Sequence, residues 1–174
     1  RIRAFGLSNE STWGTSQWLR LSDAGHGPRV ASVQNEYSLM CRLYDTDMAE
    51  LSVNEDVWLL AFSPLATGLL TGKYRSGAVP ADSRMALVNG LGGRNTSRAV
   101  DASEAYCAVA DKHGVDPVHM SLAFCQERPF MGSVIFGATT SDQLAHIIDG
   151  KDFMLSDELR RDLNQTHRAH PMPY

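Results

Sequence analysis

Residues 61–74 read AFSPLATGLLTGKY, in which an apolar, strand-like approach ends at a Ser-Pro pair and a turn with two glycines leads to a single cation, Lys73. The phosphate-binding loop G-x-x-x-x-G-K-[ST] combines a strand, a glycine turn and a lysine in a similar way. This stretch departs from it twice, because its glycines enclose one residue too few and Tyr74 replaces the hydroxyl residue. The stretch therefore predicts a strand and a tight turn, and phosphate binding needs support from the rest of the chain.

Similar strand-like segments occur on both sides of this stretch, rich in β-branched, aromatic and leucine residues, with helical periodicity between them. The first three segments recur at about 28 residues, which is the span of a βαβ unit. The pattern predicts a parallel α/β architecture. The expected strands are residues 2–7, 30–33, 58–62 and 133–136, with helices around residues 18–21, 48–51, 105–110, 120–124, 140–148 and 156–166. Asp116, just before Pro117, and Ser156 are the expected N-caps of the helices around 120–124 and 156–166.

Polar residues follow each expected strand: Ser8-Asn9, Gln34-Asn35, Ser63 and Thr139-Thr140. No G-x-G-x-x-G motif follows a strand to favour a doubly wound dinucleotide-binding fold. Polar loops at the carboxyl ends of the strands are typical of a βα-barrel, which needs roughly 250 residues. We therefore expect a (β/α)8 TIM barrel of which residues 1–174 supply only part, and a start at Arg1 without Met also indicates a fragment.

The composition indicates one globular unit, because the chain has 174 residues and 43% hydrophobic content. A net charge of -4 with both signs interspersed argues against nucleic-acid and membrane-surface binding. The three cysteines are far apart and odd in number, so we expect free buried thiols and a cytoplasmic protein. A glycine-rich segment, residues 77–97, is expected to be a long mobile loop on the ligand-binding face.

Histidines and carboxylates give no predicted metal site, because converging ligands cannot be argued from their spacing. An H-x-x-H pair near the tail is expected on an exposed turn, and an acidic cluster at a helix start, where it suits the helix dipole. Three further histidines are expected to be single surface residues. The pair is His167 and His170, the acidic cluster is Asp45, Asp47 and Glu50, and the single histidines are His26, His113 and His119.

Four motifs in order carry a family resemblance: FGLSN (5–9), VQNEYSL (33–39), AFSPLATGLLTGKY (61–74) and FGATTSDQL (136–144). Together they resemble the second half of the aldo-keto reductases, with the nearest match in the Tas-like bacterial branch. The resemblance implies that residues 1–174 are the C-terminal half of one (β/α)8 barrel domain. It also implies NADP(H) as cofactor, a small-molecule aldehyde or ketone as substrate, and a missing N-terminal half as partner.

The resemblance also assigns cofactor-binding positions. Carried over motif by motif, it implies contacts with the nicotinamide, the diphosphate and the adenosine phosphate. The nicotinamide residues are Ser8, Asn9 and Gln34, with Phe62 stacking on the ring; the diphosphate residues are Ser63, Pro64, Leu65, Ala66, Thr67, Gly68 and Lys73; the adenosine-end residues are Gly137, Thr139 and Gln143.

Two departures from the family pattern leave alternatives open. His146 and Ile147 replace the Glu and Asn that usually contact adenine in the family, so the preference for NADPH or NADH stays open. Arg84 or Arg94 could supply the cation that binds the 2′-phosphate of NADPH. The family's catalytic Asp, Tyr, Lys and His match no position here, so no catalytic residue is assigned. The alternatives to a reductase are a non-catalytic nicotinamide-binding regulatory subunit of the same fold, resembling potassium-channel β subunits, and an unrelated barrel enzyme with a phosphate substrate.

Overall fold

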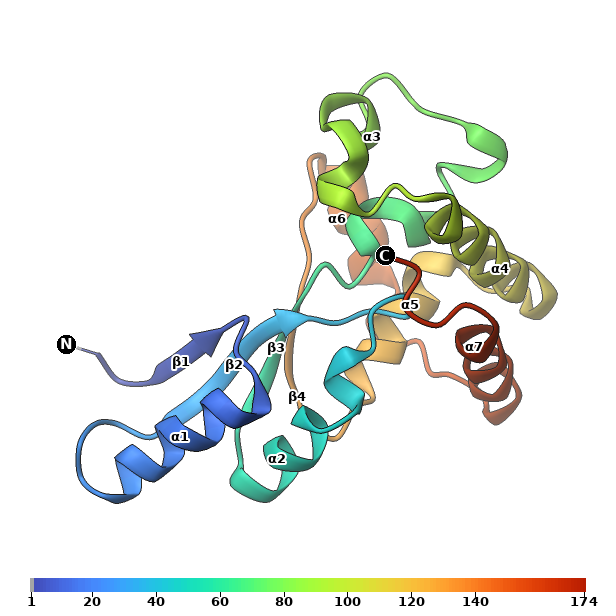
Figure 1. The fold of residues 1–174 in the computed structure, drawn as a ribbon. Coiled ribbons are helices and arrows are strands. Elements are labelled where there is room, and N and C mark those ends of the chain that lie inside the picture. The colour runs from blue at the N-terminus through green and yellow to red at the C-terminus, as the bar shows by residue number, and fades with distance from the viewer. Residues whose placement is uncertain (1) are drawn as a thin grey trace.

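A computed structural model describes residues 2–174, and one four-stranded parallel sheet organises them (Figure 1). The strands run in the order of the sequence, so each βα unit places its strand beside the previous one. The predicted parallel α/β architecture is confirmed. The strands are β1 (Phe5–Ser8), β2 (Val30–Glu36), β3 (Trp58–Phe62) and β4 (Met131–Ile135).

The strand bounds differ from the expected ones where pairing outweighs composition. The second strand continues to Glu36, because its polar end pairs with β3 as far as Phe62. The fourth begins at Met131, which pairs with Leu59. At Gly132 a Cβ atom would lie 2.8 Å from the Cβ of Trp58, so glycine lets these two strands approach each other.

Helices connect the strands, and side-chain caps begin most of them. Asp116 accepts hydrogen bonds from the N–H groups of Val118 and His119, and Ser156 accepts one from Leu159, so both predicted N-caps are confirmed. Thr140 caps the expected helix at residue 141 in the same way. The helices are α1 (Thr12–Asp23), α2 (Met48–Glu55), α3 (Arg84–Leu87), α4 (Ser97–His113), α5 (Pro117–Gln126), α6 (Ser141–Asp149) and α7 (Asp157–Ala169).

Residues 77–97, expected as a long loop, contain the short helix α3 and the 3₁₀ turns Asn89–Gly93. The segment is tied to its surroundings at both ends. The N–H of Met85 donates to the hydroxyl of Tyr74 (3.1 Å), and Arg94 donates to the carboxylate of Glu36 at the end of β2. Hydrogen bonds to residues outside the segment therefore give it a structure that its glycine content did not predict.

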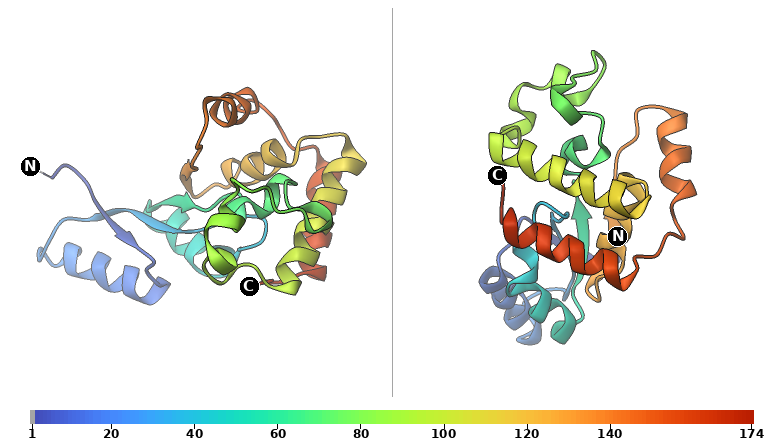
Figure 2. Two further views of the ribbon diagram at one scale, coloured as in Figure 1. Left: turned by 90° about the horizontal axis from the view of Figure 1, so that it is seen from above. Right: turned by 90° about the vertical axis from the view of Figure 1, so that its right-hand side faces the viewer.

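The two faces of the sheet differ in their surroundings. Helices α1 and α2 lie along one face (Figures 1 and 2), where Val33, Leu59 and Ala61 are completely buried. The other face carries Leu60 and Phe62, which are half-buried, and Trp58, which is 44% exposed. The sheet is open, with β1 and β4 as its edges, so these residues do not close a barrel by themselves.

The main core lies between the sheet and helices α4, α5 and α7. Tyr37 is its centre: its ring stacks on Phe124 at 5.8 Å and meets Phe130 edge-on at 5.7 Å. The Tyr37 hydroxyl donates to Asp45 at 2.8 Å, so the buried polar group is satisfied. No helix in the described residues has the length and apolar character needed to cross a bilayer.

Candidate functional site

A cavity of about 750 Å³ opens beyond the carboxyl ends of β3 and β4, where α/β folds place their ligands. Its size suits a cofactor-sized molecule. Ten of the residues assigned to the cofactor by family resemblance line it. Six come from the turn after β3, namely Ser63, Pro64, Leu65, Thr67, Gly68 and Lys73, and the other four are Arg84, Gly137, Thr139 and Gln143.

The turn after β3 has an unusual backbone. Ser63, Ala66 and Thr67 have φ values of 54°, 47° and 57°, and Gly68 follows at 101°. Non-glycine residues in this left-handed region cost about 1 kcal/mol or more each, and such strain concentrates at ligand-binding sites. The tight path brings the turn's hydroxyl side chains and Lys73 to one wall of the cavity.

Gly68 makes room for Lys73. A Cβ atom at Gly68 would lie 3.0 Å from Cε and 3.2 Å from Nζ of Lys73. The ammonium lies 5.1 Å from the centre of the Tyr74 ring and forms no ion pair with any described residue. Lys73 therefore brings a positive charge without an ion-pair partner to a cavity wall that also carries Asp82 and Asp116.

The structure separates the two arginine candidates. Arg94 donates from Nε and Nη2 to the carboxylate of Glu36 at 2.9 and 2.6 Å, and these hydrogen bonds raise the pKa of Arg94. Its charge is thus neutralised at the end of β2. Arg84 lines the cavity and has no ion-pair partner in residues 2–174. Arg84 is the arginine left to meet an anion.

Gln143 and Thr139 form one polar unit at the start of α6. The N–H and hydroxyl of Thr139 donate to Oε1 of Gln143 at 2.9 and 3.0 Å. The Gln143 side-chain oxygen is occupied, so its amide nitrogen remains as a hydrogen-bond donor toward the cavity it lines.

Ser8, Asn9 and Gln34 lie together at the ends of β1 and β2, outside the residues that line this cavity. Ser8 pairs with Gln34 in register, and the N–H of Asn9 donates to the Gln34 carbonyl at 3.0 Å. Asn9 has a φ of 52°, which turns its side chain toward the Ser8 hydroxyl at 3.3 Å. The three polar side chains therefore form a separate group along the same end of the sheet.

Two assigned residues lie elsewhere. Ala66 is completely buried in the core and does not line the cavity, so its predicted cofactor contact has no exposed side chain to make it. Phe62 is half-buried on the open face of the sheet.

The sequence did not predict several other residues of the cavity wall, because only the folding of the chain brings them there. These include Pro80, Ser83, Leu87, Asp116 and Val118.

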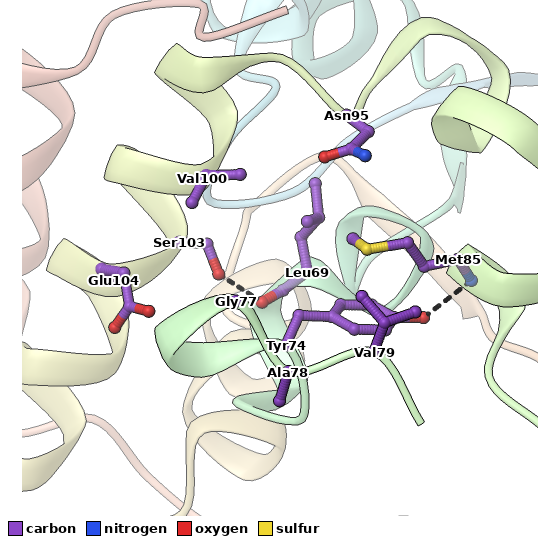
Figure 3. Close-up of a pocket in the computed structure, with 10 residues that line it drawn as sticks. All are labelled: Leu69, Tyr74, Gly77, Ala78, Val79, Met85, Asn95, Val100, Ser103 and Glu104. Atoms are coloured by element: carbon purple, nitrogen blue, oxygen red, sulfur yellow. Dashed lines mark hydrogen bonds between the residues drawn. The ribbon is translucent and has the colours of Figure 1, made fainter. Parts of the chain in front are cut away.

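A second, smaller cavity of about 140 Å³ lies between the segment after β3 and α4 (Figure 3). Both of its hydroxyl groups are already paired: the Tyr74 hydroxyl accepts from Met85, and the Ser103 hydroxyl donates to the Leu69 carbonyl at 2.6 Å. The volume is far below that of a cofactor site. This cavity belongs to the packing of the segment on α4.

The tyrosine hydroxyls are all engaged away from the larger cavity, and no tyrosine lines it in the described chain. Burial raises the pKa of Tyr106 to about 12 and also raises the pKa of Tyr37, Tyr44 and Tyr174. A tyrosine that donates a proton needs access to the reacting atom. The hydroxyl partners are Asp45 for Tyr37, Ser52 for Tyr44, Met85 for Tyr74, Leu39 for Tyr106 and Glu36 for Tyr174.

Several histidine predictions are wrong. His113 is not a lone surface residue, because its Nε2 lies 2.7 Å from Asp162 and its side chain is only 12% exposed. His119 is not alone either, since its ring stacks on that of His146. His167 lies within α7, and burial lowers its pKa. Helix packing, which spacing cannot show, causes all three differences.

The cysteines follow the prediction of free buried thiols. Burial raises the pKa of Cys41 to about 11 and that of Cys125 to about 12. The pKa of Cys107 is also raised by burial. Nucleophilic chemistry needs an accessible thiolate, so these cysteines have a packing role.

The parallel sheet and the cavity at its carboxyl edge define an α/β protein with a cofactor-sized cavity beyond β3 and β4. The sequence model of the aldo/keto reductase family matches residues 1–167, and the chain belongs to this family. The family prediction made from the four motifs is confirmed.

Individual relatives extend the comparison. The chain is 40% identical to protein Tas of Escherichia coli, covering 99% of this chain and 50% of that protein. It is 37% identical to a probable voltage-gated potassium channel subunit beta of Arabidopsis thaliana, covering 76% of this chain and 44% of that protein. A solved glycerol dehydrogenase from Gluconobacter oxydans shares the fold, with a TM-score of 0.73 and 22% identity over 98% of this chain and 50% of that one. The chain spans about half the length of these relatives.

Proposed function

We propose that this chain supplies the cofactor-binding half of an NADP(H)-dependent oxidoreductase that reduces aldehydes or ketones to alcohols. In this proposal it forms the C-terminal half of one (β/α)8 barrel. The observation that carries the proposal is the cavity beyond β3 and β4, whose wall has two cations, Lys73 and Arg84, without ion-pair partners in residues 2–174. Membership of the aldo/keto reductase family supports the reaction class.

The residues present suit a dinucleotide. Lys73 and the turn after β3 would hold the diphosphate, because an ammonium and hydroxyl groups match its charged oxygens. Arg84 would meet a 2′-phosphate, and the free amide nitrogen of Gln143 would donate to the adenosine end. The bound cofactor would supply the hydride.

The polar group at the ends of β1 and β2 would orient the nicotinamide. Ser8, Asn9 and Gln34 offer a hydroxyl and two amides, which complement the donors and acceptor of a carboxamide. Phe62 lies on the open face and pairs in register with Glu36, the last residue of β2. Its ring would pack against the nicotinamide and fix which side faces the substrate.

Replacing Lys73 by Met should weaken NADPH binding about 10- to 150-fold in the protein with the complete barrel. The reason is the loss of a charge-assisted hydrogen bond, about 1.5 to 3 kcal/mol. Fluorescence titration of NADPH measures the change. Lys151→Met is the matched control, because Lys151 is exposed outside the cavity and paired with Asp152. Equal affinities in the two variants would make Lys73 a surface residue.

Replacing Arg84 by Met should reduce NADPH affinity by about tenfold or more while NADH affinity changes little. The two cofactors differ by the 2′-phosphate alone, so the ratio of their dissociation constants isolates the contact. Arg20→Met, in α1 and away from the cavity, serves as the control. A parallel loss for both cofactors would show that Arg84 does not read the 2′-phosphate.

A second candidate is a non-catalytic nicotinamide-binding subunit of the same fold. The observation that favours it is the 37% identity to a probable potassium channel subunit beta. Both candidates bind the cofactor, and only the first turns over an aldehyde. NADPH oxidation by the protein with both barrel halves distinguishes them.

A further inference from the structure

Asp116, His119 and His146 converge at the margin of the cavity, although the sequence predicted no metal site. Asp116 caps α5, His119 lies in its first turn and His146 lies in α6. One ligand atom from each lies within 4.8 Å of the other two. Two helices that follow different strands thus bring two imidazoles and one carboxylate together.

The carboxylate is held in place by the helix it caps. Oδ1 of Asp116 accepts from the N–H groups of Val118 and His119 at 2.8 and 3.0 Å. Oδ2 is directed to α6, where it lies 3.2 Å from Nε2 of His146. One oxygen therefore fixes the orientation, and the other is presented together with an imidazole nitrogen.

His119 has the environment of a metal-ligating histidine. Its Nε2 lies 2.7 Å from the carbonyl oxygen of His146, which leaves Nδ1 as its free ring nitrogen. Ligating histidines commonly donate their other ring N–H to a carbonyl, which fixes tautomer and orientation. Gly150 adjoins the ring, since a Cβ atom there would lie 2.2 Å from Cδ2 of His119. The ring is therefore confined on that side.

The donor set selects the kind of ion. Two imidazoles and one carboxylate suit Zn²⁺, whereas Mg²⁺ and Ca²⁺ prefer oxygen ligands only. Tetrahedral zinc ligands lie about 2.0 to 2.2 Å from the ion and so roughly 3.4 Å apart. The separation of 3.2 Å between Nε2 of His146 and Oδ2 of Asp116 is close to this value, and the ligand atom of His119 lies within 4.8 Å of both.

We propose that Asp116, His119 and His146 form a Zn²⁺ site that joins α5 to α6, with a fourth coordination position open to the cavity. An ion can enter, because the side chains of His146 and Asp116 are 48% and 32% exposed. Both residues line the cavity, so the open position faces it. The apolar contact between these helices is small, with Ile147 on Val118 and Leu122, so the ion would add a second attachment of α6.

The test uses untagged, metal-stripped protein. Isothermal titration with Zn²⁺ should show one equivalent, and Co²⁺ should give the visible absorption bands of a tetrahedral site. His119→Ala and His146→Ala should each lower Zn²⁺ affinity on the order of tenfold or more. Zn²⁺ should raise the melting temperature of the unchanged protein and not that of the variants, because an ion bound only to the folded state stabilises it.

Two further variants keep the test decisive. Asp116→Asn retains a good N-cap residue while removing the carboxylate ligand, so weaker Zn²⁺ binding in a protein of unchanged circular dichroism isolates ligation from folding. The double variant His167→Gln, His170→Gln controls for binding at the tail and should bind Zn²⁺ normally. The site is refuted if the protein binds no Zn²⁺, or if only the tail variant loses binding.

Discussion

Residues 1–174 alone are expected to show no carbonyl reduction at an enzymatic rate, even where they bind NADPH. No tyrosine lines the cavity within residues 2–174, and every tyrosine hydroxyl there has another partner. Without a placed proton donor, reduction loses the acid contribution of about 10² to 10⁴. Following NADPH oxidation with a reactive aldehyde measures this loss.

The open face of the sheet is the physical reason to expect that another chain segment covers it. Trp58 and Ile135 are 44% and 39% exposed on a face that an intact barrel would enclose. Strands β1 and β4 also leave unpaired edges. Expressing the chain together with the other half of the proposed barrel should restore turnover and cover this face.

The molecular mass of the protein in solution and the rate of NADPH oxidation are measured on the same samples. Turnover at an ordinary rate from a stable monomer of residues 1–174 would contradict the half-barrel proposal and locate a proton donor within this chain. NADPH binding without turnover by the two halves together would instead favour the regulatory subunit.

Replacing Phe124 by Ala should lower the free energy of unfolding by about 3 to 5 kcal/mol. Phe124 is 1% exposed, and its ring stacks on Tyr37 with an interplanar angle of 7°. The guanidinium carbons of Arg42 and Arg128 lie 4.3 and 4.1 Å from the ring centre. Truncation would leave a cavity and remove the aromatic contact of two cations, one of which, Arg42, is buried.

Urea denaturation followed by circular dichroism measures the change. Phe136→Ala is the matched control. Phe136 follows β4 and is 38% exposed, so its replacement should lower the free energy of unfolding clearly less. A larger loss at Phe136 than at Phe124 would show that the core is not organised around the Tyr37–Phe124 stack.

Local sequence determined the elements and their order. Alternating and continuous apolar runs predicted the strand Trp58–Phe62 without error, and capping residues such as Asp116, Thr140 and Ser156 predicted three helix starts. These features could be predicted because a cap or a strand depends on neighbours within a few residues. The turn after β3 was also recognisable from its glycines and Lys73.

Tertiary structure decided which polar residues meet. Arg84 and Arg94 look alike in the sequence, and only folding pairs Arg94 with Glu36, 58 residues away, while Arg84 stays at the cavity. His119 and His146 are 27 residues apart and meet because Ile147 of α6 packs on Val118 and Leu122 of α5. Partners at such separations depend on the packing of whole helices on the sheet, and no local pattern records that packing.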